Sequence, residues 1–387
     1  MKTKFLHIAT ALLFVGFTSS CSDFLDRYPL DELSDSSFWK TENDAMMAVT
    51  DIYGCLPTWD QDEDINSDNA VHGIKWAAGN ISKGVYDPMD QSWAGSYTPI
   101  RQCNLVLEKV KDIEMSDESR KKIEGQAYFF RAFVYFNLIR SFGDVPYIDK
   151  PLNLTDVEDI TRTPREEVYA KVMADFDKAI EYLPEEWDAA NTPRVTKGAA
   201  LAMKARAALY YNNWQVAADA SKAVMDLGKY ELYDAGNTGK YQELFWEKSD
   251  GCDENILYVQ FNCPDKTHYL IGWECFPTLG WGGMNPTQSL VDAFEDKDGA
   301  PISKSTIYNE KDPFKNRDPR LEVNVLHDGE EMYGVTIKVK PLKSSGKTGI
   351  EQHGDATATG YYQQKWLDPS IDPQSEGWNM GKDWVVI

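Results

Sequence analysis

The sequence predicts a mainly α protein: a tetratricopeptide-like scaffold of helical repeats, with an irregular, loop-rich face and a few short β-strands. Three observations support this fold class. Between residues 100 and 228, apolar residues recur at spacings of three and four. Two helices joined by a short turn form a unit of ~30 residues there, near the tetratricopeptide period. After residue 228 the composition shifts to Gly, Pro, Asp and aromatic residues, which is typical of loops.

Residues 1–20 are predicted to be an export signal that is not part of the fold. Lys2 and Lys4 precede a mostly apolar stretch of 13 residues, Phe5–Phe17, which is too short to span a hydrocarbon core of ~30 Å. Small residues then lead into Cys21, as in a bacterial lipobox, where the cysteine becomes an acylated amino terminus. We therefore predict that Cys21 is lipidated and that the lipid is the only membrane anchor. The alternative is ordinary secretion, with Cys21 incidental.

The segment 21–58 is predicted to be an extended tether followed by a helix, because Ala45 and Val49 belong to an apolar series at helical spacing. Residues 56–99 show no sustained periodicity, which predicts loops. Residues 121–142 carry apolar side chains at spacings of three and four, so a long amphipathic helix is expected there.

Capping signals set further helix boundaries in the segment 100–228. Thr163-Pro164-Arg165-Glu166 is predicted to be a capping box, with Pro at the first helical position. Residues 197–211 and 214–227 are predicted to form a helix pair that ends at Gly228.

Residues 229–387 are predicted to form the loop-rich part of the fold. Residues 256–261 are a candidate buried strand, and the segments 321–325 and 335–339 alternate with period two, as strands do. The long irregular segment 262–286 lies between them. Loops of that length are usually functional or disordered, and the aromatic content of this one argues against disorder.

Five cysteines follow Cys21, without any C-x-x-C pair, so a complete disulfide framework within one chain is excluded. One bridge among Cys252, Cys263 and Cys275 and buried free thiols are both compatible with the sequence. The state of these thiols stays open at this stage.

The composition excludes some classes of function. The 387 residues include 40 Lys and Arg against 62 Asp and Glu, for a formal net charge of -22. This charge opposes binding to nucleic acid, because such binding depends on clustered Lys and Arg. The hydrophobic share of 42% is that of a globular protein. Aromatic residues make up 12%, with 12 Trp, and their flat faces suit stacking on planar or sugar rings.

The search for catalytic chemistry is negative. The sequence contains none of the motifs G-x-S-x-G, H-E-x-x-H and G-x-G-x-x-G. The histidines are scattered without ligand spacing. Asp60, Asp62, Asp64 and Asn66 alternate as calcium ligands do, but they lack the Gly and Glu of an EF-hand, so a solvated acidic loop is the preferred interpretation. We predict no catalytic residue, no metal and no cofactor.

Aromatic residues in the loops indicate carbohydrate binding instead. The apolar face of a pyranose ring lies flat on Trp or Tyr, while neighbouring polar side chains bind its hydroxyls. Core anchoring of irregular loops is the competing interpretation for each of these rings, and Trp214 and Trp246, within or beside helices, are core candidates. The predicted ligand-binding residues are Trp59, Asn69, Trp76, Trp93, Tyr269, Trp273, Trp281 and Asn285.

Several blocks, in the same order along nearly the whole chain, resemble the SusD/RagB family of outer-membrane nutrient-uptake lipoproteins. The first block runs from Cys21-Ser22-Asp23 to Lys40-Thr41-Glu42. The others are Gly125–Ala132 with Phe142–Pro146, Arg194–Ala200, Pro286–Phe294, Arg317–Arg320 and Thr359–Tyr362.

The resemblance implies one SusD-like domain over residues 21–387, anchored by lipid at the cell surface and capping a SusC-like TonB-dependent barrel. Such proteins bind oligosaccharides, or peptides in some members, and pass them to the transporter without chemistry. Family ligand sites lie in the irregular regions that match residues 56–99 and 262–286. Family members normally continue past Trp384–Ile387 into further helices, so we expect the chain to be truncated at its C-terminal end.

The sequence therefore predicts a surface glycan-binding lipoprotein that delivers oligosaccharides to a SusC-like transporter. A surface glycoside hydrolase is one alternative. A protein-interaction scaffold, or a peptide-binding SusD-like protein, is the other, because tetratricopeptide repeats commonly bind proteins.

Overall fold

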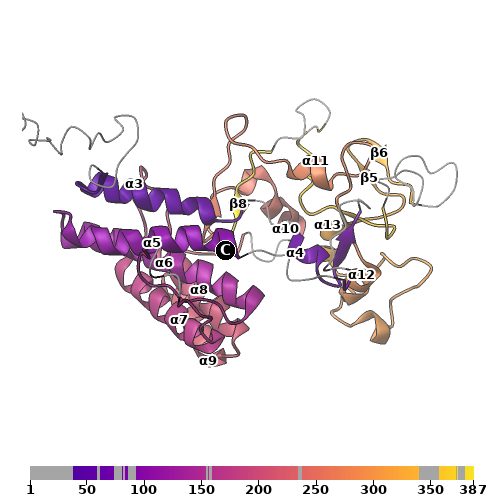
Figure 1. Cartoon of the computed structure of the whole chain (residues 1–387). Helices are drawn as coiled ribbons and strands as arrows, with labels where there is room; N and C mark the ends of the chain where they lie inside the picture. The colour runs from indigo at the N-terminus through magenta and orange to yellow at the C-terminus, as the bar shows by residue number, and fades with distance from the viewer. Residues whose placement is uncertain are drawn as a thin grey trace, which may run out of the picture.

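The protein is known from a computed structural model, and Figure 1 shows a helical region beside a loop-rich one. The lipidation candidate Cys21 and the binding candidates Trp59 and Trp76 lie outside the described residues. The structure describes residues 38–58, 62–73, 81, 83–85, 93–153, 156, 159–233, 238–339, 357–371, 373 and 380–387.

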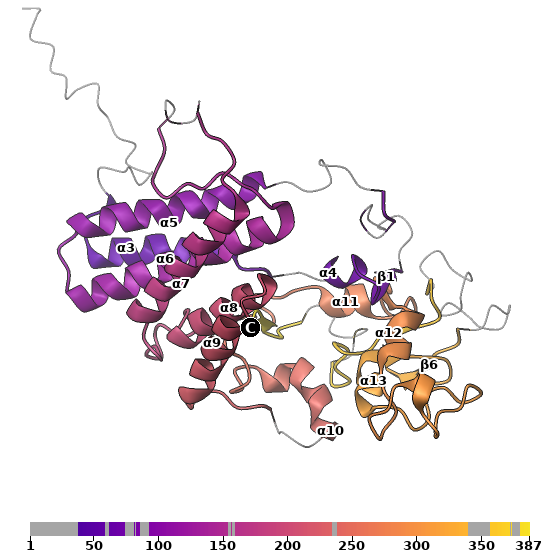
Figure 2. The same cartoon turned by 90° about the horizontal axis from the view of Figure 1, so that it is seen from below.

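The helical region, which we call the scaffold, confirms the predicted mainly α fold. Consecutive helices pack against one another along the chain, and the first packs against the second and third (Figures 1 and 2). Their buried faces form one large core that includes Phe129, Phe130 and Phe176. The scaffold helices are α3 (Glu42–Ile52), α5 (Tyr97–Lys109), α6 (Asp117–Phe142), α7 (Arg165–Tyr182), α8 (Lys197–Tyr210) and α9 (Trp214–Asp226), with 3₁₀-helices at Tyr53–Cys55, Ala94–Ser96 and Val110–Asp112.

Side-chain caps begin three of these helices. The Thr41 hydroxyl accepts a hydrogen bond from the Asp44 amide and the Asp44 side chain accepts from Thr41, so α3 has a complete capping box. Ser116 caps α6, and Thr196 caps α8. The helix pair α8 and α9 was predicted within one residue at each end, with Gly228 at a positive φ of 62° behind it.

The predicted capping box at the start of α7 was wrong. Thr163 instead pairs with Val145 in an isolated β-bridge. The Asp144 carboxylate accepts the hydrogen bond from the Arg165 amide at 2.9 Å, and Glu166 pairs with the Arg165 side chain at 2.8 Å. A residue distant in sequence thus caps this helix.

The prediction that Trp214 belongs to the core was also wrong. Its side chain is 60% exposed, because the buried face of α9 is the one that carries Ala217 and Ala220. Trp246 is half-buried.

The loop-rich region consists of short elements arranged as antiparallel two-stranded pairs: β1 with β3, β2 with β8, β4 with β7 and β5 with β6. The segment with α4 and β1 precedes α5 in the chain, yet it lies among these later elements (Figures 1 and 2). The elements are α4 (Asp62–Ile65), β1 (Ala70–His72), α10 (Thr238–Tyr241), β2 (Tyr258–Val259), α11 (Leu270–Glu274), β3 (Met284–Pro286), α12 (Gln288–Ala293), α13 (Pro319–Asn324), β4 (Val325–Leu326), β5 (Glu331–Met332), β6 (Val335–Thr336), β7 (Tyr362–Gln363) and β8 (Trp384–Val385), with 3₁₀-helices at Gln242–Phe245, Glu247–Ser249 and Ile302–Lys304.

The strands predicted from period-two alternation in this region were mostly wrong. The predicted strand 321–325 is mostly helix α13, because the Asp318 carboxylate accepts a hydrogen bond from the Arg320 amide and Pro319 occupies the first helical position. Of the segments 256–261 and 335–339, only the two-residue strands β2 and β6 form. The five described cysteines are free thiols.

The end of the chain joins the two regions. Val386 and Ile387 pack against the scaffold core, and the Arg206 guanidinium donates to the Val386 carbonyl oxygen at 3.3 Å. The loop-rich region has its own apolar core, with Phe276 and Leu367 fully buried. Among the described residues, no helix is both long and apolar enough to cross a bilayer.

Candidate ligand-binding site

A cavity of about 350 Å³ opens beside the antiparallel ribbon of β1 and β3, and we call it the ribbon cavity. It combines one side of the ribbon with residues from α4, α12, β7 and β8, which are distant in sequence. The lining residues are Asp64, Asn69, Ala70, Glu274, Met284, Pro286, Leu290, Phe294, Asn324, Gln363, Lys365, Trp366 and Trp384.

The ribbon holds the predicted residue Asn69 at the cavity wall. Its backbone carbonyl oxygen accepts from the Thr287 amide at 2.9 Å, just beyond the pairing of Ala70 with Pro286. The Asn69 side chain is exposed. It is therefore placed where a bound molecule can reach it.

The predicted residue Asn285 has a different position. It is fully buried in β3, where its Nδ2 donates to the Gly282 carbonyl oxygen at 3.2 Å and its Oδ1 accepts from the Ala358 amide at 2.8 Å. Both polar ends of the amide are thus used inside the protein. Asn285 positions the loop before β3 and does not line the ribbon cavity.

Two tryptophans that the sequence analysis did not select line the ribbon cavity. The rings of Trp366 and Trp384 are stacked, with centroids 6.3 Å apart and planes 15° from parallel. Trp384 is held there because β8 pairs with β2 through Val259. Both rings lie outside helices among polar residues, which is the criterion that selected the other tryptophans.

Lys365 places an ammonium group between aromatic rings of the same cavity. Its Nζ lies 4.2 Å from the ring centroid of Phe245 and 5.4 Å from that of Trp366. Desolvation lowers the pKa of Lys365, and the nearby charge of Asp64 opposes that shift. Within the described part of the chain, this ammonium makes no hydrogen bond or ion pair. It is available to a bound molecule as a donor.

The other predicted aromatic residues of this region lie on the loop that precedes β3. The Trp273 amide donates to the Tyr269 carbonyl oxygen at 3.0 Å, and the Trp281 amide donates to the Gly272 carbonyl oxygen at 3.0 Å. The Trp273 ring lies directly on Gly283, where an added Cβ would be 2.3 Å from the indole Nε1. All three aromatic side chains are half-buried. Trp273 adjoins the cavity-lining Glu274 in α11, so this loop borders the ribbon cavity.

Trp93 lies elsewhere, on the scaffold. Its ring packs against Phe142 at 5.6 Å between centroids, and the Arg162 guanidinium lies 4.6 Å over it. Trp93 does not line the ribbon cavity.

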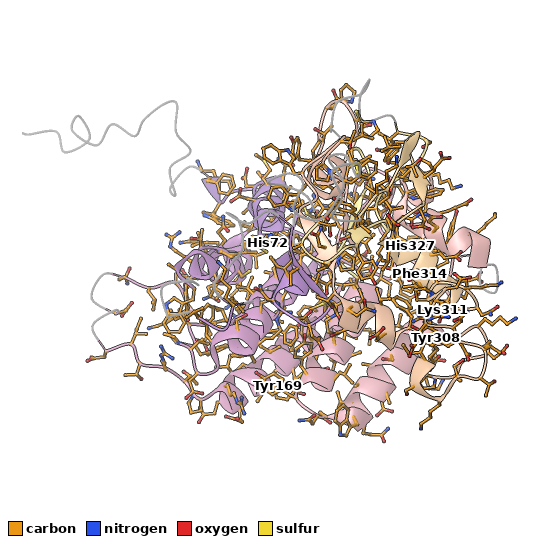
Figure 3. All side chains as sticks on the ribbon, turned by 90° about the vertical axis from the view of Figure 1, so that its right-hand side faces the viewer. His72, Tyr169, Tyr308, Lys311, Phe314 and His327 are labelled. Carbon is orange, nitrogen blue, oxygen red and sulfur yellow. The ribbon has the colours of Figure 1, made fainter. Side chains whose placement is uncertain are left out.

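A second aromatic cluster is separate from the ribbon cavity. Phe314 stacks on His327 with centroids 3.5 Å apart, and Figure 3 shows both rings grouped with Tyr308 and well away from His72 of β1. Phe314 also packs beside the small core around Val291. These half-buried rings therefore contribute to the packing of the loop-rich region.

The ribbon cavity combines the groups that a carbohydrate needs. Stacked indoles offer an apolar face, while Asp64, Asn69 and Gln363 offer hydrogen-bonding groups around it. Its volume falls within the usual range for small-ligand sites. Among the described residues, no group of three or more His, Cys, Asp or Glu side chains is arranged to hold a metal ion.

The fold and the cavity define a class of protein: a helical-repeat scaffold that carries a loop-rich, aromatic-lined binding face. Comparison with known families identifies it further. A SusD-like family model described as "Starch-binding associating with outer membrane" matches residues 24–209, and the SusD family model matches residues 246–387. The chain belongs to the SusD/RagB family.

Individual relatives agree with this assignment. SusD-like protein P2 of Formosa agariphila is 29% identical over 276 residues, which are 67% of this chain and 53% of that protein. A crystal structure of a SusD-like protein from Bacteroides fragilis has a TM-score of 0.80 and 28% identity, covering 93% of this chain and 75% of that one. A SusD-like carbohydrate-binding protein of the same species has a TM-score of 0.77 and 25% identity, covering 90% and 72%. The chain spans about half to two thirds of the length of the curated relatives it matches.

Proposed function

We propose that this chain captures oligosaccharides at the bacterial cell surface, delivers them to a SusC-like TonB-dependent outer-membrane transporter and catalyses no reaction itself. The observation that carries the proposal is the ribbon cavity, which is lined by the stacked rings of Trp366 and Trp384 together with Lys365. The carbohydrate-binding relative from Bacteroides fragilis supports a glycan as the ligand class.

The cavity can hold a sugar in one defined orientation. The C–H face of a pyranose ring would lie against the indole surface that Trp366 and Trp384 present to the cavity. The ring hydroxyls would donate to the Asp64 carboxylate and accept from Lys365 and the Asn69 amide. Because hydroxyls both donate and accept, they satisfy all three groups at once.

The loop with Trp273 and Trp281 would extend this surface for a longer oligosaccharide. It borders the cavity through Glu274, and its rings are half-buried, so part of each ring is accessible. A chain of sugars that leaves the cavity on that side would meet these rings next.

The surface location and the partner are parts of the same proposal. Acylation at Cys21 would attach the protein to the outer membrane, and the match to a family described as associating with the outer membrane supports this location. Replacing Cys21 by Ala should move the protein from the membrane fraction to the soluble fraction. A pull-down with the acylated protein should recover the transporter, and recovery of no barrel protein would contradict the proposed delivery.

Affinity electrophoresis across a panel of polysaccharides tests ligand capture. At least one polysaccharide should retard the protein, and Trp366→Ala should weaken binding about tenfold, which corresponds to ~1.4 kcal/mol. Trp273→Ala and Trp281→Ala test the extension. Trp214→Ala is the control, because this exposed tryptophan lies on the scaffold. The proposal fails if no polysaccharide retards the protein, or if Trp214→Ala weakens binding as much as Trp366→Ala. Release of reducing sugar by the purified protein would establish a hydrolase instead.

A further inference from the structure

A second cavity, of about 430 Å³, lies between the scaffold and the loop-rich region, and we call it the junction cavity. It is walled by the connection between α7 and α8, by the residues that follow α9 and by the turn before β2. Among the residues that the structure describes, the ribbon cavity and the junction cavity share no lining residue. The junction cavity is lined by Glu185, Glu186, Trp187, Thr192, Pro193, Arg194, Thr196, Lys229, Tyr230, Gly251, Cys252, Asp253, Asn255, Ile256 and Tyr258.

Aromatic rings in this cavity are held in place by the protein. The Trp187 Nε1 donates to the Val195 carbonyl oxygen at 2.9 Å. The Tyr230 hydroxyl shares a hydrogen bond of 3.2 Å with the Thr196 hydroxyl, and its ring lies so close to Gly198 that an added Cβ would be 2.2 Å from the Tyr230 oxygen. Both rings are therefore in place before any ligand arrives, which lowers the entropic cost of binding.

Asn255 supplies a buried donor without a partner. Its side chain is 8% exposed, and its Nδ2 finds no hydrogen-bond acceptor among the described residues. The backbone of Asn255 is fixed by a hydrogen bond from its amide to the Cys252 carbonyl oxygen at 3.0 Å. A buried polar group that lacks a partner is unfavourable. A ligand oxygen that accepts from Nδ2 would remove this cost.

The two cations of the cavity are already engaged by the protein. Lys229 forms an ion pair with Glu186 at 2.8 Å. The guanidinium of Arg194 donates to Gln126 Oε1 at 3.2 Å and to Thr50 Oγ1 at 3.0 Å. An anionic ligand would have to compete for both groups, so the cavity is not suited to phosphate or to a uronic acid.

Two carboxylates of the cavity are available. Glu185 and Asp253 are exposed and form no ion pair among the residues that the structure describes. They offer acceptors, while Asn255 requires an acceptor from the ligand. A cation would satisfy the carboxylates but not Asn255. A hydroxylated ligand satisfies both, because each hydroxyl donates and accepts.

We propose that the junction cavity binds a neutral sugar unit, as a second carbohydrate contact apart from the ribbon cavity. The C–H face of the sugar lies on the fixed rings of Trp187 or Tyr230, and its hydroxyls pair with Asn255 and with the carboxylates. This proposal is independent of ligand capture in the ribbon cavity.

Crystals of the full chain, soaked with methyl α-glucoside, methyl α-mannoside or methyl β-galactoside, locate the bound sugar directly. The expected result is density for one of these neutral glycosides in the junction cavity, with an oxygen within hydrogen-bond distance of Asn255 Nδ2. Glucosamine and glucuronate are the charged comparison probes. Absence of sugar density from the junction cavity overturns the proposal, even if a sugar occupies the ribbon cavity. Density there only for glucosamine or glucuronate overturns it as well.

Titration followed by NMR adds a quantitative test with the same neutral glycoside. Asn255→Leu should weaken its binding in the junction cavity about tenfold, since Nδ2 makes no hydrogen bond to any described residue that would be lost. Glu185→Gln should weaken it several-fold, and Glu167→Gln, an exposed carboxylate on α7 outside the cavity, should leave it unchanged. Unchanged affinity in Asn255→Leu, or an equal loss in Glu167→Gln, overturns the proposal.

Discussion

The scaffold and the loop-rich region are stabilised in different ways. The scaffold is a stack of helices around one large apolar core, whereas the loop-rich region consists of elements of two to six residues that cannot bury a comparable surface. Loop positions there depend on specific hydrogen bonds and close contacts. A substitution in the scaffold should therefore act mainly on global stability, and one in the loops mainly on the shape of the ligand site.

Polar groups inside the scaffold are few and tightly paired. Arg131 of α6 and Asp175 of α7 are both buried and joined by two hydrogen bonds of 2.7 Å, and a third bond of 2.9 Å connects Arg131 to Asn104 of α5. Desolvation alone would lower the pKa of Arg131, but the hydrogen bonds and charge of Asp175 outweigh it and raise that pKa. Together with Asn104, this pair links three helices.

Polar groups in the loop-rich region hold the backbone instead. Arg317 donates to the carbonyl oxygens of Pro313 and Phe294 at 2.9 Å each and of Val291 at 2.5 Å, where α12 and the loop after it meet. The Thr357 hydroxyl similarly donates to the Tyr361 carbonyl oxygen at 2.7 Å, just before β7. These contacts take the place of regular secondary structure.

Breaking the buried pair of the scaffold should have the largest effect. Asp175→Ala leaves the Arg131 guanidinium buried without its carboxylate, which we expect to lower the free energy of unfolding by ~3–5 kcal/mol. Urea denaturation measures this loss. Asp177→Ala on the same helix removes a more exposed partner of Lys204 and should cost at most ~1 kcal/mol. Equal losses in the two variants would contradict the importance assigned to the buried pair.

A substitution beneath Trp273 should affect the ligand site more than the fold. In Gly283→Ala the new methyl group would overlap the indole, so the ring or the loop must move, at a cost of ~1–3 kcal/mol. We expect weaker retention by the polysaccharide that binds the unmodified protein, together with a shift in tryptophan fluorescence.

Gly54→Ala is the matched control, because in the described part of the chain no atom beyond its direct neighbours lies within 4 Å of the added Cβ. It should change the free energy of unfolding by less than ~1 kcal/mol and leave binding unchanged. If Gly283→Ala also binds like the unmodified protein, the position of Trp273 does not matter for the ligand site.

The contrast between the scaffold and the loop-rich region also explains what the sequence could predict. Helices α8 and α9 follow from apolar spacing and from Gly228, because the signals lie within the element. The stacking of Trp366 on Trp384 could not be predicted, since it depends on β8 pairing with a strand more than 100 residues earlier. The burial of Asn285 likewise depends on Ala358, a contact distant in sequence. Local patterns predicted which loops carry aromatic residues but not which side chains meet.

The start of β8 should give the fold a measurable pH dependence. Burial, with help from the nearby charge of Asp250, raises the pKa of Asp383 to about 6, against the hydrogen bond from the Phe261 amide. The folded state thus binds more protons than the unfolded state between about pH 4 and 6, and its stability falls as pH rises through that window. Asp383→Asn keeps an acceptor for the Phe261 amide and should abolish this fall of stability with rising pH.

Urea denaturation at pH 4.5, 5.5 and 7 measures the difference. Between pH 4.5 and pH 7, the free energy of unfolding of Asp383→Asn should rise by ~1 kcal/mol relative to that of the unmodified protein. This figure is reduced for screening by solvent. Asp265→Asn, at an exposed position close in sequence to the isolated bridge between His268 and Met380, should show no such gain. Parallel pH profiles of Asp383→Asn and the unmodified protein would contradict the raised pKa.

The smallest effect on the free energy of unfolding should come from Lys365. Its charge is useful to a ligand but unfavourable for the fold. Desolvation lowers the pKa of this ammonium, so the folded state binds fewer protons than the unfolded state between the lowered value and the ordinary value near 10.4. The contribution of Lys365 to the free energy of unfolding therefore rises as pH rises through that window. Lys365→Met keeps an unbranched chain against Phe245 and Trp366. It loses both cation–π contacts but also removes the desolvated charge, so the free energy of unfolding at pH 7 should change by only ~0.5 kcal/mol. Urea denaturation from pH 7 to 10 should show the rise in the unmodified protein and in Lys297→Met, an exposed control, but not in Lys365→Met. If Lys365→Met shows the same rise, the ammonium is better solvated than its position between two rings implies, and its value to a ligand as a donor is correspondingly smaller.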